Sequence, residues 1–147
     1  MIKMNDLYIK IRPFLILLIR LILGGTFLYA AIPKILDPAG FAIEVENYQI
    51  INGFLSHYSA LLLPWIELYC GVLIIINKMA RYALTILILL IGVFIIALLS
   101  AVFRGLDISC GCFASDTRVS WLRIYEDVIF LCMAFYLFLQ DNLKFKS

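Results

Sequence analysis

The chain has 147 residues, of which 65% are hydrophobic and 15% are charged, and its formal net charge is +2. Soluble domains are about 45–50% apolar and about 25% charged, so these charged residues are too few to cover a soluble globule. The composition excludes an ordinary soluble fold, a disordered chain and a nucleic-acid-binding module with a basic face, and it predicts a single integral membrane domain over residues 1–147.

Four apolar blocks are long enough to form membrane-spanning helices. A helix needs about 20 mostly apolar residues to cross a hydrocarbon core of about 30 Å. The runs are continuous rather than alternating, which favours helices over strands, because backbone polar groups in lipid must be satisfied within each span. The sequence therefore predicts an all-α, four-helix membrane bundle with spans at residues 13–32, 60–76, 82–103 and 121–139.

The segment between the first two blocks has a mixed composition. Prolines at both ends of residues 33–38 predict a turn, because each proline disfavours helical geometry in the residue before it. Apolar residues then follow at helical spacing from Phe41 to Tyr48, opposite Glu44 and Glu46. This pattern predicts an amphipathic helix at the outer membrane interface. The alternative is that this helix simply packs over one end of the bundle and buries its apolar side there.

Two ionisable residues lie deep within the predicted spans. At 1.5 Å per residue, Arg20 is about 12 Å from the inner edge and Glu67 is about 10 Å from the outer edge. In a core of about 30 Å their depths differ by only about 8 Å. Because charges in lipid normally face the interior and find partners, we predict an Arg20–Glu67 pair. Such a pair would set helix register, line a polar pocket for a quinone head group, or conduct a proton.

The distribution of Lys and Arg predicts the orientation. The N-terminal arm, residues 77–81 and the C-terminal tail are basic and belong inside, whereas residues 33–59 and 104–120 belong outside. The prediction is a multi-pass protein of a bacterial inner membrane with both termini cytoplasmic.

Cys110 and Cys112 form a Cys-Gly-Cys element just after the third predicted span, on the oxidising side of the membrane. Their spacing is within reach of a disulfide, and Gly111 supplies the backbone freedom to close so small a ring. Strained, exposed disulfides tend to be the catalytic ones, which favours a redox-active pair. A static disulfide is an alternative, although so short a loop adds little stability. A soft-metal site is another, although no third ligand is evident nearby.

The other two cysteines lie near the middle of their predicted spans. We expect Cys70 and Cys132 to be small, unreactive hydrophobes in the bundle core. A relay that carries electrons from Cys110 and Cys112 into the membrane is the alternative.

Three parts of the chain resemble the DoxX/MauE membrane proteins. They are residues 24–35 with 37–41 and Tyr48, residues 63–68, and residues 103–113. The Cys-Gly-Cys-Phe element in the last of these resembles the branch named for the methylamine-utilisation protein MauE.

This resemblance implies a four-helix membrane bundle that acts in redox protein maturation. MauE is associated with processing, transport or disulfide formation of the methylamine dehydrogenase small subunit, although many relatives occur where methylamine is not metabolised. The architecture is also similar to that of quinone-linked disulfide-forming proteins and vitamin K epoxide reductases, which is an analogy of fold alone.

The sequence thus favours a membrane thiol–disulfide factor. A thiolate from Cys110 or Cys112 would exchange with a disulfide of a thioredoxin-like or maturing extracytoplasmic partner. A quinone is a candidate electron acceptor, and the cofactor is otherwise unidentified. Two alternatives stay open: a non-catalytic subunit of a membrane complex, and a small-solute transporter that uses Arg20 and Glu67. The chain lacks the repeat symmetry common in transporters.

Overall fold

Nearly all of the described backbone is helical, as expected where peptide groups in lipid must bond within the chain. The computed structural model describes the backbone of residues 4–108 and 119–145 and the side chains of residues 10–108 and 119–141. These residues form no strand and five helices: α1 (Met4–Leu36), α2 (Pro38–Asn47), α3 (Phe54–Ile75), α4 (Ala80–Phe103) and α5 (Trp121–Phe145). For this part of the chain, the predicted all-α class is confirmed.

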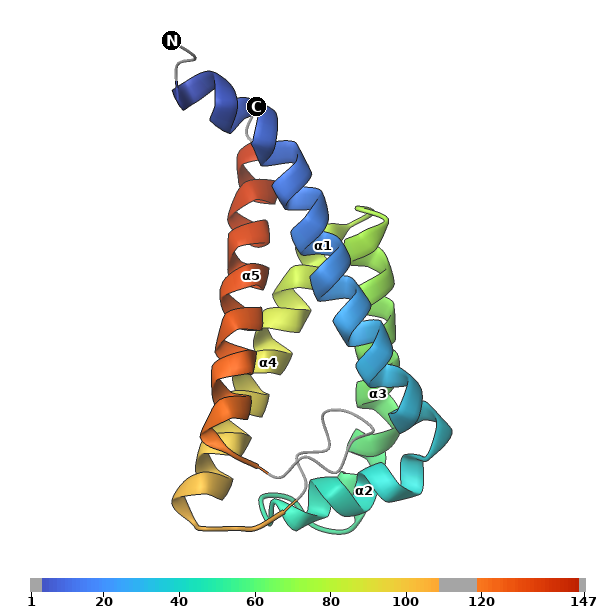
Figure 1. Ribbon diagram of the computed structural model, residues 1–147. Helices are drawn as coiled ribbons and strands as arrows, with labels where there is room; N and C mark the ends of the chain where they lie inside the picture. The colour runs from blue at the N-terminus through green and yellow to red at the C-terminus, as the bar shows by residue number, and fades with distance from the viewer. Residues whose placement is uncertain (1–3, 109–118, 146–147) are drawn as a thin grey trace.

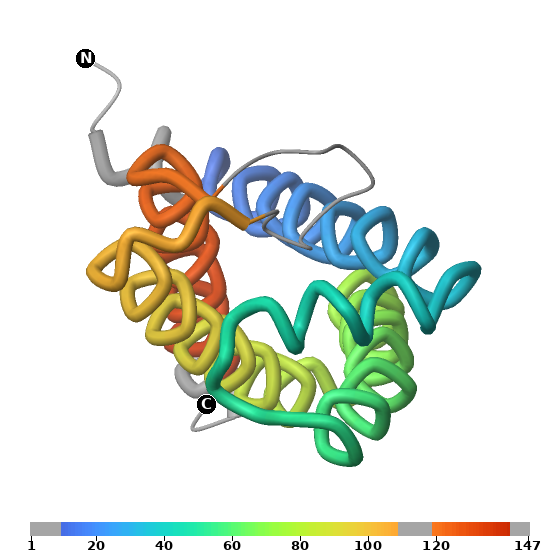
Figure 2. The backbone as a smooth tube through the Cα atoms, turned by 90° about the horizontal axis from the view of Figure 1, so that it is seen from below, coloured from blue at the N-terminus to red at the C-terminus, as the bar shows by residue number. Residues whose placement is uncertain are grey.

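The four long helices run side by side, and α2 crosses them at one end (Figure 1). α1 begins and α5 ends at the opposite end, and the link between α3 and α4 turns toward that end too. Seen along the bundle, the long helices follow one another in the order α1, α3, α4, α5, with α2 lying across them (Figure 2). α1 packs most extensively on α3, and α4 packs mainly on α5.

Three of the described helices are long and apolar enough to cross a bilayer. These segments are Lys10–Leu36 in α1, Phe54–Ile75 in α3 and Ala80–Phe103 in α4. The fourth predicted span lies within α5, which is helical but carries Glu126 and Asp127 in its second turn. Over its described residues, α5 is not among the helices with this length and composition. A fourth crossing therefore stays a prediction.

The predicted turn at residues 33–38 is only partly correct. α1 continues through Pro33 and ends at Leu36, so the first helix is longer at this end than the predicted block. Pro33 lies in the last turn of α1, and its carbonyl accepts a hydrogen bond from the Asp37 N–H at 3.0 Å. Only Asp37 leaves the helical region, at φ −130° and ψ 77°, as the following Pro38 requires. The Asp37 side chain then accepts from the Gly40 N–H at 2.9 Å and caps α2.

α2 is held against α3 by a small apolar cluster. Phe41 and Ala42 are buried on α2 and pack with the buried Ala60 of α3. Tyr48, just after α2, is also buried, whereas Ile43 remains 60% exposed. A helix is present in this segment and covers one end of the bundle. Its amphipathic character and its place at the membrane interface stay predictions.

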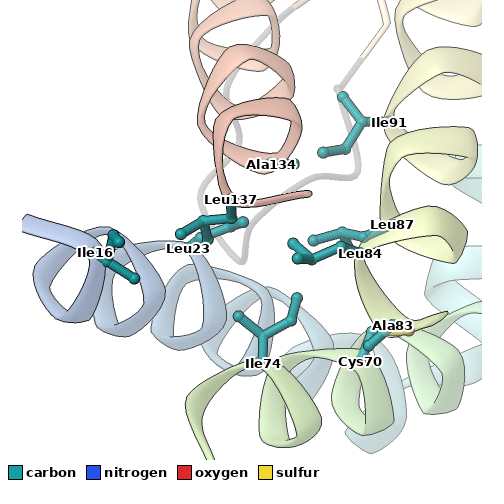
Figure 3. Packing of buried hydrophobic residues seen from close by; sticks show 10 residues of the cluster. All are labelled: Ile16, Leu23, Cys70, Ile74, Ala83, Leu84, Leu87, Ile91, Ala134 and Leu137. Atoms are coloured by element: carbon teal, nitrogen blue, oxygen red, sulfur yellow. The ribbon is translucent and has the colours of Figure 1, made fainter. Parts of the chain in front are cut away.

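The core of the bundle is a cluster of aliphatic side chains from all four long helices (Figure 3). Leu23, Leu84 and Leu137 point toward one another at its centre, and each is fully buried. Cys70 belongs to this cluster, as expected for a small hydrophobe. The prediction for Cys132 is wrong, because its side chain is exposed. α5 directs its buried Ala134 and Leu137 inward, and Cys132 lies on the outer face of the same helix.

The close contact between α1 and α3 depends on two glycines that face each other. A Cβ at Gly71 would lie 2.9 Å from the Gly24 carbonyl oxygen, and a Cβ at Gly24 would lie 2.8 Å from the Gly71 carbonyl oxygen. Small residues allow such backbone approach between membrane helices. These glycines therefore set the register of α1 against α3.

Replacing Gly71 with alanine should destabilise the protein by about 1–3 kcal/mol, because the added methyl group collides with backbone. Gly92 of α4 is the matched control, since a Cβ there meets nothing within 4 Å. Gly92→Ala should be neutral or stabilising by up to about 1 kcal/mol through helix propensity. Thermal unfolding in detergent measures both changes, and equal effects of the two substitutions would contradict the proposed close contact.

Candidate functional site

The predicted site residues Cys110 and Cys112 lie in residues 109–118, outside the described part of the chain. The structure does describe the two positions that flank this segment. The Val119 N–H donates to the Ile108 carbonyl at 3.0 Å. The segment that carries both cysteines therefore starts and ends at adjoining backbone, at the end of the bundle where α4 stops and α5 begins.

The chain leaves α4 in a defined direction. Gly105 has φ +64°, in the left-handed region that favours glycine. Its N–H donates to Val102 O at 3.1 Å, and the Leu106 N–H donates to Ala101 O at 3.0 Å. This pair of bonds is a Schellman motif, which ends the helix and satisfies its last carbonyls. The direction in which Gly105 and Leu106 leave α4 is thereby fixed.

Arg104 ties this helix end to the residues that directly follow α2. Its guanidinium donates to the Tyr48 carbonyl at 3.2 Å and to Gln49 Oε1 at 2.9 Å. Ile108 and Val119 pack with a cluster that includes the buried Tyr48. The residues on both sides of the cysteine segment are thus anchored on the bundle.

Burial, together with the nearby Asp127 and Glu44 carboxylates, raises the pKa of the Tyr48 phenol well above its ordinary value.

The predicted Arg20–Glu67 pair is wrong. Both side chains are buried, at 4% and 9% exposed, but each has a different partner. Arg20 pairs with Asp141 of α5, with a nitrogen–oxygen distance of 2.5 Å. It also donates to the Ile74 carbonyl of α3 at 3.4 Å.

The register of α1 against α3 explains this outcome. Gly24 faces Gly71, and the two helices run in opposite directions, so Arg20 lies beside the end of α3 near Ile74. Glu67 is seven residues before Ile74, which corresponds to about 10 Å along the helix. Arg20 is therefore too far along the bundle axis to meet Glu67.

Glu67 instead accepts a bidentate ion pair from Lys34. The Lys34 ammonium lies 2.9 Å from both Oε1 and Oε2 of Glu67. The two side chains are only 7% and 9% exposed. The ammonium also lies over the Phe41 ring, 4.9 Å from its centroid. This contact joins α1, α2 and α3 around one buried charge pair, at the end of the bundle that also holds Arg104. The sequence assigned Lys34 to the turn outside the first span, so its role was missed.

Asp127 of α5 is a second acidic residue that sequence reasoning missed. Its Oδ2 atom is buried and has no hydrogen-bond partner in the described part of the chain. With Lys34, Glu67 and Thr26 it lines a small cavity of about 50 Å³ between the helices. A buried carboxylate oxygen without a hydrogen bond is costly, so Oδ2 is a natural acceptor for a water molecule or a ligand group.

Within the described ranges, no group of three or more His, Cys, Asp or Glu side chains is placed to hold a metal ion. Cys70 and Cys132 are both free thiols, one in the core and one on the outer face. Their different faces give no support to the predicted alternative of an electron relay through them.

Long apolar helices joined by buried ion pairs define a multi-pass membrane protein. The chain belongs to the family described as methylamine utilisation protein MauE, whose model matches residues 12–140. The resemblance noted on the sequence is thereby confirmed for MauE.

Curated relatives in the same family are similar over most of this chain. The methylamine utilization protein MauE of Methylophilus methylotrophus is 33% identical over 106 residues, which are 71% of this chain and 56% of that protein. The protein of the same name from Paracoccus denitrificans is 30% identical over 127 residues, or 84% of this chain and 68% of that protein. The chain thus spans between about half and two thirds of the length of these relatives. No solved structure matches it.

Proposed function

We propose that this protein is a membrane thiol–disulfide factor for the maturation of extracytoplasmic proteins, with Cys110 and Cys112 as its redox pair. Membership of the MauE family supports a role in methylamine utilisation, after which the relatives are named. The single observation that carries the redox role is a Cys-Gly-Cys element whose flanking residues, Ile108 and Val119, meet in a backbone hydrogen bond on the bundle. Two cysteines so close together in the sequence, in a segment whose flanking residues lie on the bundle, suit thiol exchange with a partner.

The proposed topology has four crossings, with α5 as the fourth. α5 has 25 residues, which is enough length to span a core of about 30 Å. Its acidic residues Glu126 and Asp127 lie near one end, where Glu126 pairs with Arg123 at 2.6 Å. Both termini then lie in the cytoplasm of a bacterial cell, and residues 104–120 and α2 face outward, consistent with the basic residues inside. α2 lies at the outer interface in this arrangement.

The exchange conserves atoms and electrons. A thiolate of the pair attacks one sulfur of the partner's disulfide, forming a mixed disulfide and expelling the other partner sulfur as a thiolate. The second cysteine then attacks the mixed disulfide, which leaves a Cys110–Cys112 disulfide and a reduced partner. The same steps in reverse oxidise a partner dithiol. The proposed partners are a thioredoxin-like protein or a maturing extracytoplasmic protein.

Trapping of the mixed disulfide tests this function. In a Cys70→Ala/Cys132→Ala background, Cys112→Ser leaves one thiol that can hold a partner but cannot release it. We expect a covalent adduct with a thioredoxin-like or maturing extracytoplasmic protein on a non-reducing gel, identified by mass spectrometry and lost with reductant. The Cys110→Ser variant is the reciprocal test.

The matched control for trapping lacks both Cys110 and Cys112 and should form no adduct. If neither single variant forms an adduct while both unfold at the temperature of the parent protein, the thiol–disulfide function is wrong.

A further inference from the structure

An apolar cavity of about 340 Å³ lies between α3 and α4, and the ion pair of Lys34 and Glu67 forms the charged part of its lining. Small-molecule pockets are typically about 300–1,000 Å³, so this cavity is large enough for a ring-sized ligand. Its rim includes Leu89 and Val93 of α4, which are 66% and 69% exposed on the outer face of the bundle. A molecule dissolved in the bilayer could therefore enter sideways, between two helices.

A second apolar cavity, of about 310 Å³, continues from the first beneath α2. The two share Phe41 and Phe94, whose rings supply flat apolar walls, and they also share Leu63 and Val93. Because they share these residues, the two cavities adjoin and form one apolar path, and its aromatic residues suit a planar ring.

The polar end of this path has an unused donor. A lysine ammonium has three N–H groups, and two of those of Lys34 point to the Glu67 oxygens at 2.9 Å. The third has no hydrogen-bond acceptor in the described part of the chain, and the nearby Phe41 ring offers only its face. A carbonyl oxygen of a ligand would complete the coordination of this ammonium.

The charge at this end favours a neutral ligand. Lys34 and Glu67 cancel each other. The other ionisable groups that line these cavities are the Asp127 carboxyl in the adjoining small cavity and Glu44 and Tyr48 in the second cavity, and none of them is cationic. An anionic lipid head group would meet no net positive charge there. Asp127 Oδ2, which is buried and has no hydrogen-bond partner among the described residues, could accept from a hydroxyl or a water molecule in that cavity.

We propose that this path binds an isoprenoid quinone of the membrane, with a ring carbonyl accepting a hydrogen bond from Lys34 and the tail leaving between α3 and α4. The inference rests on the proposed function, because it names the electron acceptor of the cysteine pair. The Cys110 and Cys112 thiols lose two electrons and two protons and form one S–S bond. The quinone gains both electrons and both protons and becomes a quinol.

Native mass spectrometry of the detergent-solubilised protein, titrated with decylubiquinone, tests the binding. We expect a one-to-one quinone adduct whose dissociation constant rises by about tenfold or more in Val93→Trp, which obstructs both cavities. Ile96→Trp is the matched control: Ile96 is on the same helix and is 68% exposed, but it lines neither cavity. Its affinity should stay within about twofold of the parent.

A second variant tests the polar end. Lys34→Met/Glu67→Leu replaces the ion pair with apolar groups and should also weaken decylubiquinone binding by about tenfold, because the carbonyl loses its donor. If Val93→Trp and Lys34→Met/Glu67→Leu bind decylubiquinone as tightly as the parent protein, the quinone only partitions into the micelle. That result would overturn the proposed site. An adduct with phospholipid that decylubiquinone does not displace would overturn it as well.

Binding is measured in parallel on the Cys110→Ser/Cys112→Ser variant, which separates this proposal from the proposed function. Quinone binding that survives there while the trapping experiment fails would support the site and contradict thiol exchange. Successful trapping without quinone binding would support thiol exchange and contradict the quinone site.

Discussion

Replacing Lys34 with methionine should lower the free energy of unfolding by about 3–5 kcal/mol, because a buried carboxylate would lose its cationic partner. The Lys34 ammonium is bonded to both Glu67 oxygens at 2.9 Å. Both side chains are less than 10% exposed, so water cannot replace the lost partner. The change is measured by chemical unfolding in a mild detergent.

The Lys34→Met/Glu67→Leu variant should recover much of this loss, since apolar pairs often replace buried ion pairs at little cost. Lys78→Met is the matched control, because Lys78 is exposed in the link between α3 and α4 and should change stability by less than about 0.5 kcal/mol. A Lys34→Met variant as stable as Lys78→Met would contradict the buried pair.

The second large effect concerns Arg20. Arg20→Leu should cost about 3 kcal/mol or more, because Asp141 on α5 would be left partly buried without its partner. The two side chains are 4% and 12% exposed and 2.5 Å apart. A double-mutant cycle should show that Arg20→Leu and Asp141→Leu are coupled by about 1–3 kcal/mol.

The same cycle separates this pairing from the one that the sequence predicts. Arg20→Leu and Glu67→Leu should be additive within about 0.5 kcal/mol, because the two residues share no partner. Coupling between Arg20 and Glu67 as large as that between Arg20 and Asp141 would contradict the register of α1 and α3.

The helices could be predicted from the sequence because their apolar runs match the thickness of a bilayer. Three of the four predicted spans are confirmed as helices of suitable length and composition. The end of the first was less predictable, because a proline in the last turn of a helix, such as Pro33, removes a single hydrogen bond. α1 therefore continues to Leu36 and carries Lys34 inward.

The ion-pair partners could not be predicted, because depth along each span was estimated from the ends of the apolar blocks. The position of α1 against α3 is set by the contact of Gly24 with Gly71, which a single sequence does not mark. One feature of the sequence did indicate that Lys34 faces inward. Lys34 follows Arg20 by fourteen residues, which is close to four helical turns, so both side chains lie on nearly the same face of α1.

The inward face of α5 was equally hard to assign, because apolar residues occur all around this helix between its charged ends. Cys132 was therefore assigned to the core, whereas Ala134 and Leu137 are the buried residues. For the cysteine pair the sequence alone motivates the proposed chemistry, and the structure describes the contacts of Arg104, Ile108 and Val119 on either side of it.

The thiol state of the protein across a glutathione titration is the most direct test of the redox pair. In the Cys70→Ala/Cys132→Ala background, alkylation and mass spectrometry would count the free thiols of Cys110 and Cys112 at each potential. The pair should change reversibly between dithiol and disulfide while the bundle stays folded. Inert structural disulfides have reduction potentials below about −300 mV, and the midpoint potential of this pair should be less negative than that. A pair that stays oxidised until the protein is denatured would be a structural disulfide and would contradict the proposed function.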